Sequence, residues 1–248
     1  MKINIEETVK FFDEGQNSRG HASAIVGIIG EDLNVVAFKH HCESEGKIVE
    51  VFDGPVTQGV KRGKRLDRWI YVKEKNGTKT LYQCEIKNWS ATAIGGRDLP
   101  ISEDNKSKDI VGVSRYYWEH QKKEFSKNTK PNNVTKVFLR MSYDRNEDLK
   151  KFFEREKINF KDCEQKPLLI YWMPISNDGD CKHYFSEKIS SLDVKFKQDF
   201  KDVDIFSVSL YFRKLLKEKK DKTLSINIAN VEKRIKYRLD MLNKIIVF

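Results

Sequence analysis

The chain has 248 residues, of which 39% are hydrophobic and 11% aromatic, a composition typical of a globular protein. Its net charge of +10 favours a polyanionic partner, nucleic acid first, and no apolar run approaches the roughly 18 residues that span a bilayer. Four scattered cysteines without a Cys-x-x-Cys pair exclude a zinc ribbon and a thioredoxin-type motif. Because reduced thiols suit the cytoplasm and the N-terminus lacks a signal-peptide hydrophobic region, we expect a cytoplasmic protein.

The first part of the chain predicts a helix, a strand and a hairpin. Apolar residues at three- and four-residue steps indicate the helix, and alternating residues around Asn76-Gly77 indicate the hairpin. The expected elements are a short helix or lead-in over 1–13, a helix over 22–41, a strand over 47–52, a loop over 53–64, and hairpin strands over 65–74 and 78–88.

The rest of the chain begins with a long segment over 89–108 that has little periodicity, which is typical of a functional loop. The expected elements after it are helices over 110–125, 146–156, 203–219 and 226–246 and strands over 133–142 and 167–174. This order predicts an α/β or α+β fold, a mixed sheet flanked by helices. We expect one domain over 1–248, in which a strand and basic helices over 146–248 pack on the core.

The hairpin contains two carboxylates and a lysine that can converge. Side chains alternate along a strand, so Glu85 and Lys87 share a face, and Asp67 must face the same way. A two-residue loop over 76–77 would turn Asp67 to the wrong face. A three-residue loop over 75–77, with its glycine left-handed, would place Asp67 opposite Glu85. We therefore predict this loop, or a bulge elsewhere in the hairpin.

Such a trio has a defined chemistry. Carboxylates on adjacent strands can bind Mg²⁺ through oxygen ligands, with phosphate oxygens and waters completing the octahedron. The metal lowers the pKa of a bound water and offsets charge on the phosphate. Lys87 can orient the nucleophile, help to deprotonate it or stabilise developing negative charge. A charged Glu85 between apolar neighbours is costly unless it is paired or liganded.

An Asp, a spacer and then Glu-x-Lys on the next strand resemble the PD-(D/E)XK nuclease superfamily. Asp67 matches the first acid, Glu85 the second and Lys87 the lysine, although Leu66 stands where the family has proline. The resemblance implies a restriction-endonuclease-like fold with an αβββαβ core, here over 20–145. It also implies Mg²⁺, with Mn²⁺ as a substitute.

The resemblance implies further site residues. An acid from the first core helix would join the two metal ligands; Glu31 looks like that acid, and Asp32 is the alternative. Gln121 lies where some nucleases of this type carry a site glutamine.

Basic and aromatic residues flank the candidate site. They can hold phosphates or bases, with an ordinary basic loop or core packing as the alternative. The residues expected to contact nucleic acid are Arg62, Lys64, Arg68, Trp89 and Arg97. The basic amphipathic C-terminal helices can dock on a nucleic-acid backbone or a partner subunit, with a solvated outer face as the alternative.

The first hypothesis is a Mg²⁺-dependent endonuclease that hydrolyses phosphodiester bonds, of DNA before RNA, in restriction or antiviral defence. The main alternative is a catalytically inactive module of the same fold that binds nucleic acid or protein. A regulatory subunit with an acidic protein partner is a third hypothesis. A homodimer or a subunit of a larger complex fits each of them, and we expect no membrane partner.

Overall fold

The computed structural model describes residues 1–11, 29–53, 66–87, 109–218 and 222–245. Within them lies a six-stranded sheet with the order β2-β3-β4-β5-β7-β6. Its strands are β2 (Ile48–Asp53), β3 (Arg68–Lys73), β4 (Lys79–Lys87), β5 (Glu164–Tyr171), β6 (Tyr184–Lys188) and β7 (Asp202–Ser207). Neighbours β2, β3 and β4 are antiparallel, β5 and β7 run parallel to β4, and β6 is antiparallel to β7. The expected mixed sheet flanked by helices is confirmed.

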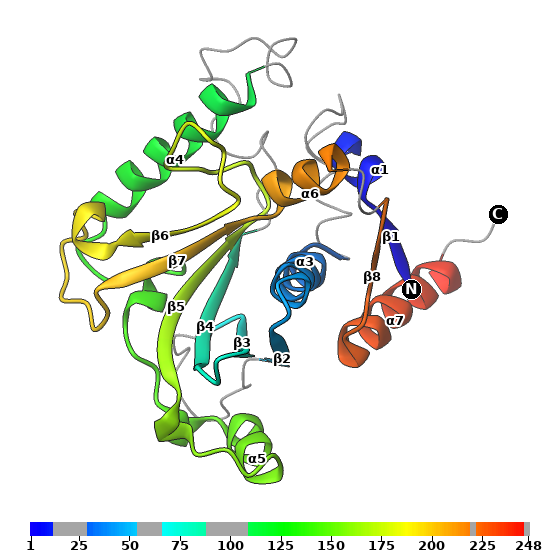
Figure 1. Ribbon diagram of the computed structural model, residues 1–248, viewed down its shortest axis with the longest axis horizontal. Helices are drawn as coiled ribbons and strands as arrows, with labels where there is room; N and C mark the ends of the chain where they lie inside the picture. Colours follow the sequence, from blue (N-terminus) through cyan, green and yellow to red (C-terminus); the bar gives the residue numbers. More distant parts are fainter. Residues whose placement is uncertain (12–28, 54–65, 88–108, 219–221, 246–248) are drawn as a thin grey trace.

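Helices cover both faces of this sheet (Figure 1). One face carries α3 (Glu31–Ser44) and α6 (Val208–Lys217), and the other carries α4 (Ile110–Ser126), η4 (Thr135–Phe138) and α5 (Glu147–Arg155). Because strand side chains alternate, Cys84 and Ile86 of β4 belong to the α3-side core, whereas Leu81 belongs to the α4-side core. Glu85 and Lys87 therefore project from the α4 face.

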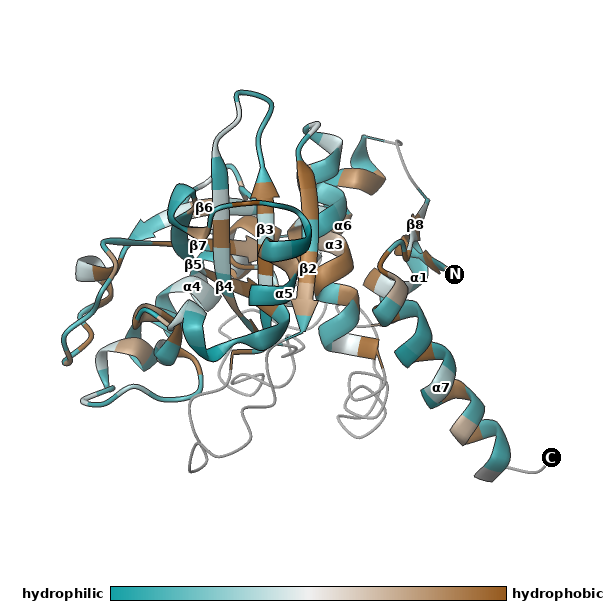
Figure 2. Ribbon diagram, turned by 90° about the horizontal axis from the view of Figure 1, so that it is seen from below, coloured by the Kyte–Doolittle hydropathy of each residue, from teal (hydrophilic) through white to brown (hydrophobic). Residues whose placement is uncertain are grey.

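The two ends of the described chain meet beside α3 and α6 (Figure 1). Strand β1 (Lys2–Asn4) pairs antiparallel with β8 (Thr223–Ser225), next to α1 (Ile5–Val9) and α7 (Ala229–Ile245). Figure 2 shows α7 extending away from the rest of the molecule, with hydrophobic and hydrophilic residues alternating along it. None of the described helices has the length and apolarity needed to cross a bilayer. The short helices η5 (Tyr143–Arg145), η6 (Phe160–Asp162) and η7 (Ile189–Leu192) complete the described elements.

The hairpin has the predicted three-residue loop. The Glu74 amide donates to the Thr78 carbonyl at 2.9 Å, and the Gly77 amide donates back to the Glu74 carbonyl at 3.0 Å. Gly77 has a φ of +87°, in the left-handed region. The strands then pair in one register that ends at Arg68↔Cys84. The local turn chemistry of Asn76-Gly77 thus sets the facing of every residue in β3 and β4.

The strand expected over 133–142 is wrong, because η4 and irregular chain occupy this segment. The Asn132 side-chain oxygen accepts the amides of Val134 and Thr135, each at 2.8 Å, and so turns the chain into a helical conformation. The strand that pairs with β4 on this side is instead β5, which runs parallel to it.

The Gln83 side chain of β4 makes hydrogen bonds to the backbone of the same segment. Its side-chain nitrogen donates to the carbonyls of Val137 at 2.5 Å and Leu139 at 2.6 Å, and its oxygen accepts the Met141 amide at 3.1 Å. Backbone groups that a strand would offer to a neighbour are therefore satisfied by one buried side chain.

The helix expected over 203–219 is wrong in its first turns, which form β7, and helix α6 begins only at Val208. Short apolar runs fit a buried strand as well as a helix, and periodicity cannot separate them. Strands β6 and β8 were not predicted. The part after residue 146 thus contributes β5, β6 and β7 to the main sheet instead of one strand with helices. Of the helix expected over 22–41, residues 22–28 lie outside the described residues.

We predict that Gly77→Ala lowers the free energy of unfolding by about 1 kcal/mol, because a Cβ strains the left-handed backbone although nothing lies within 4 Å of it. The control is Gly179→Ala, whose new Cβ would meet only Arg115 at 3.8 Å and whose φ is ordinary. Urea unfolding followed by circular dichroism measures both. Equal losses in the two variants would contradict the role of the turn.

We predict that Gln83→Leu costs about 2–4 kcal/mol of unfolding free energy, because three backbone groups lose their partner at a fully buried position. Gln165→Leu, which removes only a contact to Arg140 at the surface, is the matched control and should cost less than about 1 kcal/mol. The same urea titration applies, and a Gln83 variant as stable as its control would disprove the bracing role.

Candidate active site

The Asp67 side chain makes the last hydrogen bond between the two strands of the hairpin. Its amide donates to the Cys84 carbonyl at 3.1 Å, and its Oδ2 accepts the Ile86 amide at 2.8 Å. The regular register, continued one step past Arg68↔Cys84, would face Asp67 toward Glu85. The carboxylate instead takes the place of the next main-chain acceptor, so the backbone fixes its position at the end of the two strands.

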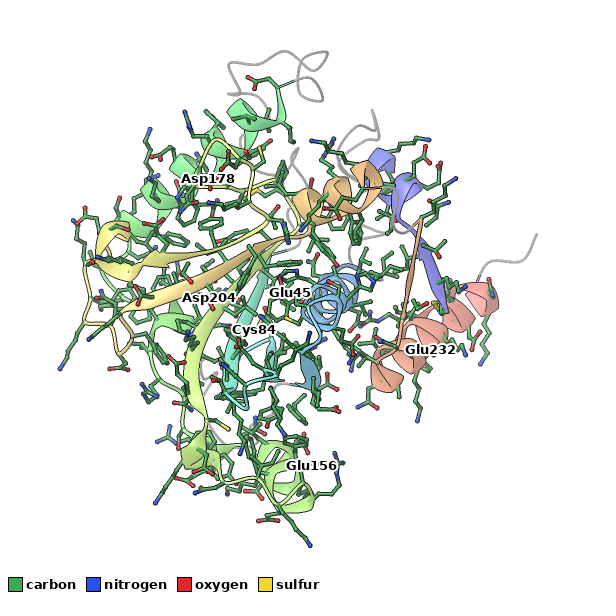
Figure 3. All side chains as sticks on the ribbon, in the orientation of Figure 1. Glu45, Cys84, Glu156, Asp178, Asp204 and Glu232 are labelled. Atoms are coloured by element: carbon green, nitrogen blue, oxygen red, sulfur yellow. The ribbon has the colours of Figure 1, made fainter. Side chains whose placement is uncertain are left out.

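Glu85 is a buried carboxylate between two lysines. Its side chain is only 2% exposed, with the Lys87 Nζ 2.7 Å from Oε1 and the Lys136 Nζ 2.9 Å from Oε2. Burial and the nearby Asp67 charge raise the pKa of Glu85 to about 7, against the two lysines that lower it. The Lys136 contact is an ion pair without hydrogen-bond alignment, so a metal ion at Oε2 would have to displace this ammonium. Cys84, the preceding residue, marks the position in Figure 3.

Lys136 is the site residue that sequence reasoning missed. It lies in η4, within the segment expected to be a strand, and its side chain is 9% exposed. No spacing rule connects it to Glu85, because the pair depends on how Gln83 folds residues 137–141 over β4. The only sequence signal is a lysine placed among the apolar residues of this segment.

Gln121 of α4 lies on the same face of the sheet as Glu85. It is 2% exposed, and its Oε1 accepts the Tyr171 hydroxyl at 3.4 Å. Tyr171 pairs with Lys87 in the parallel register of β4 and β5. Burial, followed by the charge of Glu85, raises the pKa of the Tyr171 hydroxyl, which therefore stays protonated. Gln121 thus supports the site through Tyr171.

The helix acids have other partners. Asp32 is fully buried, and its carboxylate receives Arg68 at 3.1 Å, Arg234 at 2.7 Å and Arg238 at 3.0 Å. Three guanidinium groups on one carboxylate hold α7 against α3 and β3. Asp32 therefore has a structural role in this arrangement.

Glu31 is 52% exposed, with an oxygen 3.9 Å from the Arg68 guanidinium. Among the described residues, no three His, Cys, Asp or Glu side chains come together to hold a metal ion. The expected trio of Glu31, Asp67 and Glu85 is therefore not formed. The reason is that α3 packs on the face of β4 opposite to Glu85.

Arg68, expected to contact nucleic acid, is buried. Its guanidinium donates to the Asp67 carbonyl at 2.6 Å and lies 3.5 Å from Asp53, in addition to its contact with Asp32. It connects β3 to α3 and to the end of β2 instead of presenting a cation to a ligand. The other expected contacts, Arg62, Lys64, Trp89 and Arg97, lie outside the described residues.

The remaining pair, Asp67 and Glu85, fits a divalent cation of the Mg²⁺ type. Both offer carboxylate oxygens, the ligands that Mg²⁺ takes in proteins, and it usually keeps several waters beside one or two carboxylates. The Glu85 Oε2 is buried and accepts no aligned hydrogen bond. A cation would compete there with the Lys136 ammonium.

No protein-family model matches this chain, and searches of curated proteins and of solved structures give no match either. The comparisons therefore neither support nor oppose the resemblance drawn from Asp67, Glu85 and Lys87.

We predict that the buried Glu85 makes the metal-free protein less stable as pH rises from about 4.5 to 7. Its pKa is near 4.5 when unfolded and about 7 when folded, so the folded state holds a proton that the unfolded state releases in this window. The loss is on the order of 2–3 kcal/mol and is complete above the folded pKa. Glu85→Gln should remove it.

The measurement is urea unfolding at several pH values in the presence of a chelator. The control is Glu156→Gln, at a side chain that is 44% exposed, which should keep the wild-type pH dependence. A Glu85 variant with the wild-type slope would show that this carboxyl titrates normally.

Proposed function

We propose that this chain is a Mg²⁺-dependent endonuclease with a restriction-endonuclease-like fold, hydrolysing phosphodiester bonds in DNA before RNA. The observation that carries the proposal is the buried Glu85 carboxylate beside Asp67 and Lys87 at the ends of two paired strands. A buried charged cluster of this kind is expensive to maintain and is typical of functional sites.

The order of elements supports the same proposal. Helix α3, strands β2, β3 and β4, helix α4 and strand β5 occur in this order, with helix α5 and the short helices η4, η5 and η6 inserted between α4 and β5, and β5 runs parallel to β4. This is the αβββαβ order that the resemblance implies. Such a core would span residues 31–171 instead of 20–145, because its last strand is β5.

Each site residue would have a separate role in the reaction. Asp67 and Glu85 would hold the cation, which when bound lowers the pKa of a water and offsets phosphate charge. The Lys87 ammonium lies 2.7 Å from the Glu85 carboxylate, next to the proposed cation position. It can donate to a phosphate oxygen or orient the attacking water. Lys136 adds a second positive charge next to the developing negative charge.

Two observations favour a second candidate, a nucleic-acid-binding module without turnover. The Lys136 ammonium occupies the Glu85 oxygen that a metal would use, and the helix acids do not join the site. A module of this kind would bind nucleic acid through its positive surplus of ten charges without cleaving it. Restriction or antiviral defence is the setting we propose for either candidate, by analogy alone.

The deciding experiment compares wild type, Glu85→Gln and Lys87→Met on supercoiled DNA and on RNA with Mg²⁺, Mn²⁺ or Ca²⁺. We expect cleavage by wild type with Mg²⁺ or Mn²⁺ and rates at least about 100-fold lower in both variants. Lys127→Met, at a lysine that is 68% exposed, is the matched control and should cleave like wild type.

Gel retardation of the same substrates separates the two candidates. Retardation without cleavage in any metal would favour the binding module. Cleavage that persists in both site variants would place the activity elsewhere and end the proposal for this site.

A further inference from the structure

A second concave site lies between α6, the loop over 180–183 and the first residue of α4. Its volume is about 630 Å³, within the range of pockets that hold small ligands. It is separate from the candidate active site, because none of its lining residues belongs to β3, β4 or η4.

The walls carry a surplus of positive charge. Four cationic side chains and two carboxylates line the pocket: Lys182, Arg213, Lys214 and Lys217 against Asp180 and Glu218. Lys182 pairs with Asp178 at 2.9 Å. In the described part of the chain, no carboxylate lies within salt-bridge distance of Lys214 or Lys217, which stand one turn apart on α6.

The wall opposite α6 adds a neutral imidazole. The His183 Nε2 lies 3.4 Å from the His41 Nδ1, and burial, His41 and Lys214 together lower the pKa of His183 to about 4. At neutral pH this ring therefore offers a hydrogen bond without adding charge.

The pocket lies at the carboxyl end of the parallel strands. Helix α6 begins directly after β7, the Ser209 amide donates to the Trp172 carbonyl at 2.9 Å, and the Trp172 amide donates to the Lys87 carbonyl at 3.0 Å. Two main-chain hydrogen bonds thus connect the end of β4 to the first turn of α6. Ligands of open α/β sheets bind beyond this end of the strands.

We propose that this pocket binds the phosphate group of a nucleotide, free or within a nucleic-acid strand. Lys214 and Lys217 face the phosphate from α6 and Lys182 from the opposite wall, while the apolar Ile110 and Leu210 border the sugar or base. The α6 dipole alone explains two lysines in its last turn but not a third cation across the pocket. The proposal goes beyond the proposed function and does not depend on it.

Calorimetric titration of the full chain, in the presence of a chelator, tests the pocket with three probes: adenosine, adenosine monophosphate and an eight-nucleotide single-stranded DNA. We expect the double variant Lys214→Gln/Lys217→Gln to weaken binding of a phosphate-bearing probe at least about tenfold. The matched control is Lys233→Gln/Lys236→Gln, which neutralises two exposed lysines at the same spacing on α7 and should bind like wild type.

The probes identify the source of the phosphate. Binding of the monophosphate indicates a free nucleotide, and binding of the oligonucleotide alone indicates a strand. Adenosine bound as tightly as its monophosphate, equal weakening in both double variants, or no binding by wild type would each overturn the proposal. The titration contains a chelator and measures binding without cleavage, so failure of the nuclease proposal and failure of the pocket are distinguishable.

Discussion

The structure around the candidate site depends on one carboxylate kept out of water. Glu85 is buried on the α4 face of the sheet, and its charge is offset by Lys87 on its own strand and by Lys136 in η4. An isolated buried charge is far too costly to keep, so both lysines are required for an ionised Glu85. The Lys136 pair also brings η4 against β4, where Gln83 completes its backbone hydrogen bonds. Alternate residues of one strand thus organise both the site and the chain that covers it.

The elements that the sequence predicts correctly are those determined by residues close together in the chain. The glycine in the turn after Asn76 determines the loop, and the loop determines which side chains of β3 and β4 share a face. The same holds for α4 and α5, whose apolar periodicity and capping residues Asp109 and Asn146 lie within a few positions of each helix start. For these elements the local signal and the folded structure agree.

What could not be read depends on partners far away in the sequence. The segment after Asn132 has the composition of a strand, but Gln83, more than fifty positions earlier, takes its carbonyls. Glu31 was preferred to Asp32 as the helix acid, because the arginines that bury Asp32, Arg234 and Arg238, follow it by 202 and 206 residues. In a chain that is 34% charged, no spacing singles out which arginine meets which carboxylate. The environment of each helix acid therefore depends on contacts that are far away in the sequence.

The arginine cluster on Asp32 has a consequence for biosynthesis. Arg234 follows Asp32 by 202 residues, so a ribosome adding about 5–20 residues per second makes this partner roughly 10–40 seconds later. Until then the nascent helix would have to bury a carboxylate with Arg68 as its main counter-charge. We therefore expect helix α3 to pack only loosely on the sheet until α7 has been synthesised. During this interval the partly folded chain would expose surface that chaperones can bind.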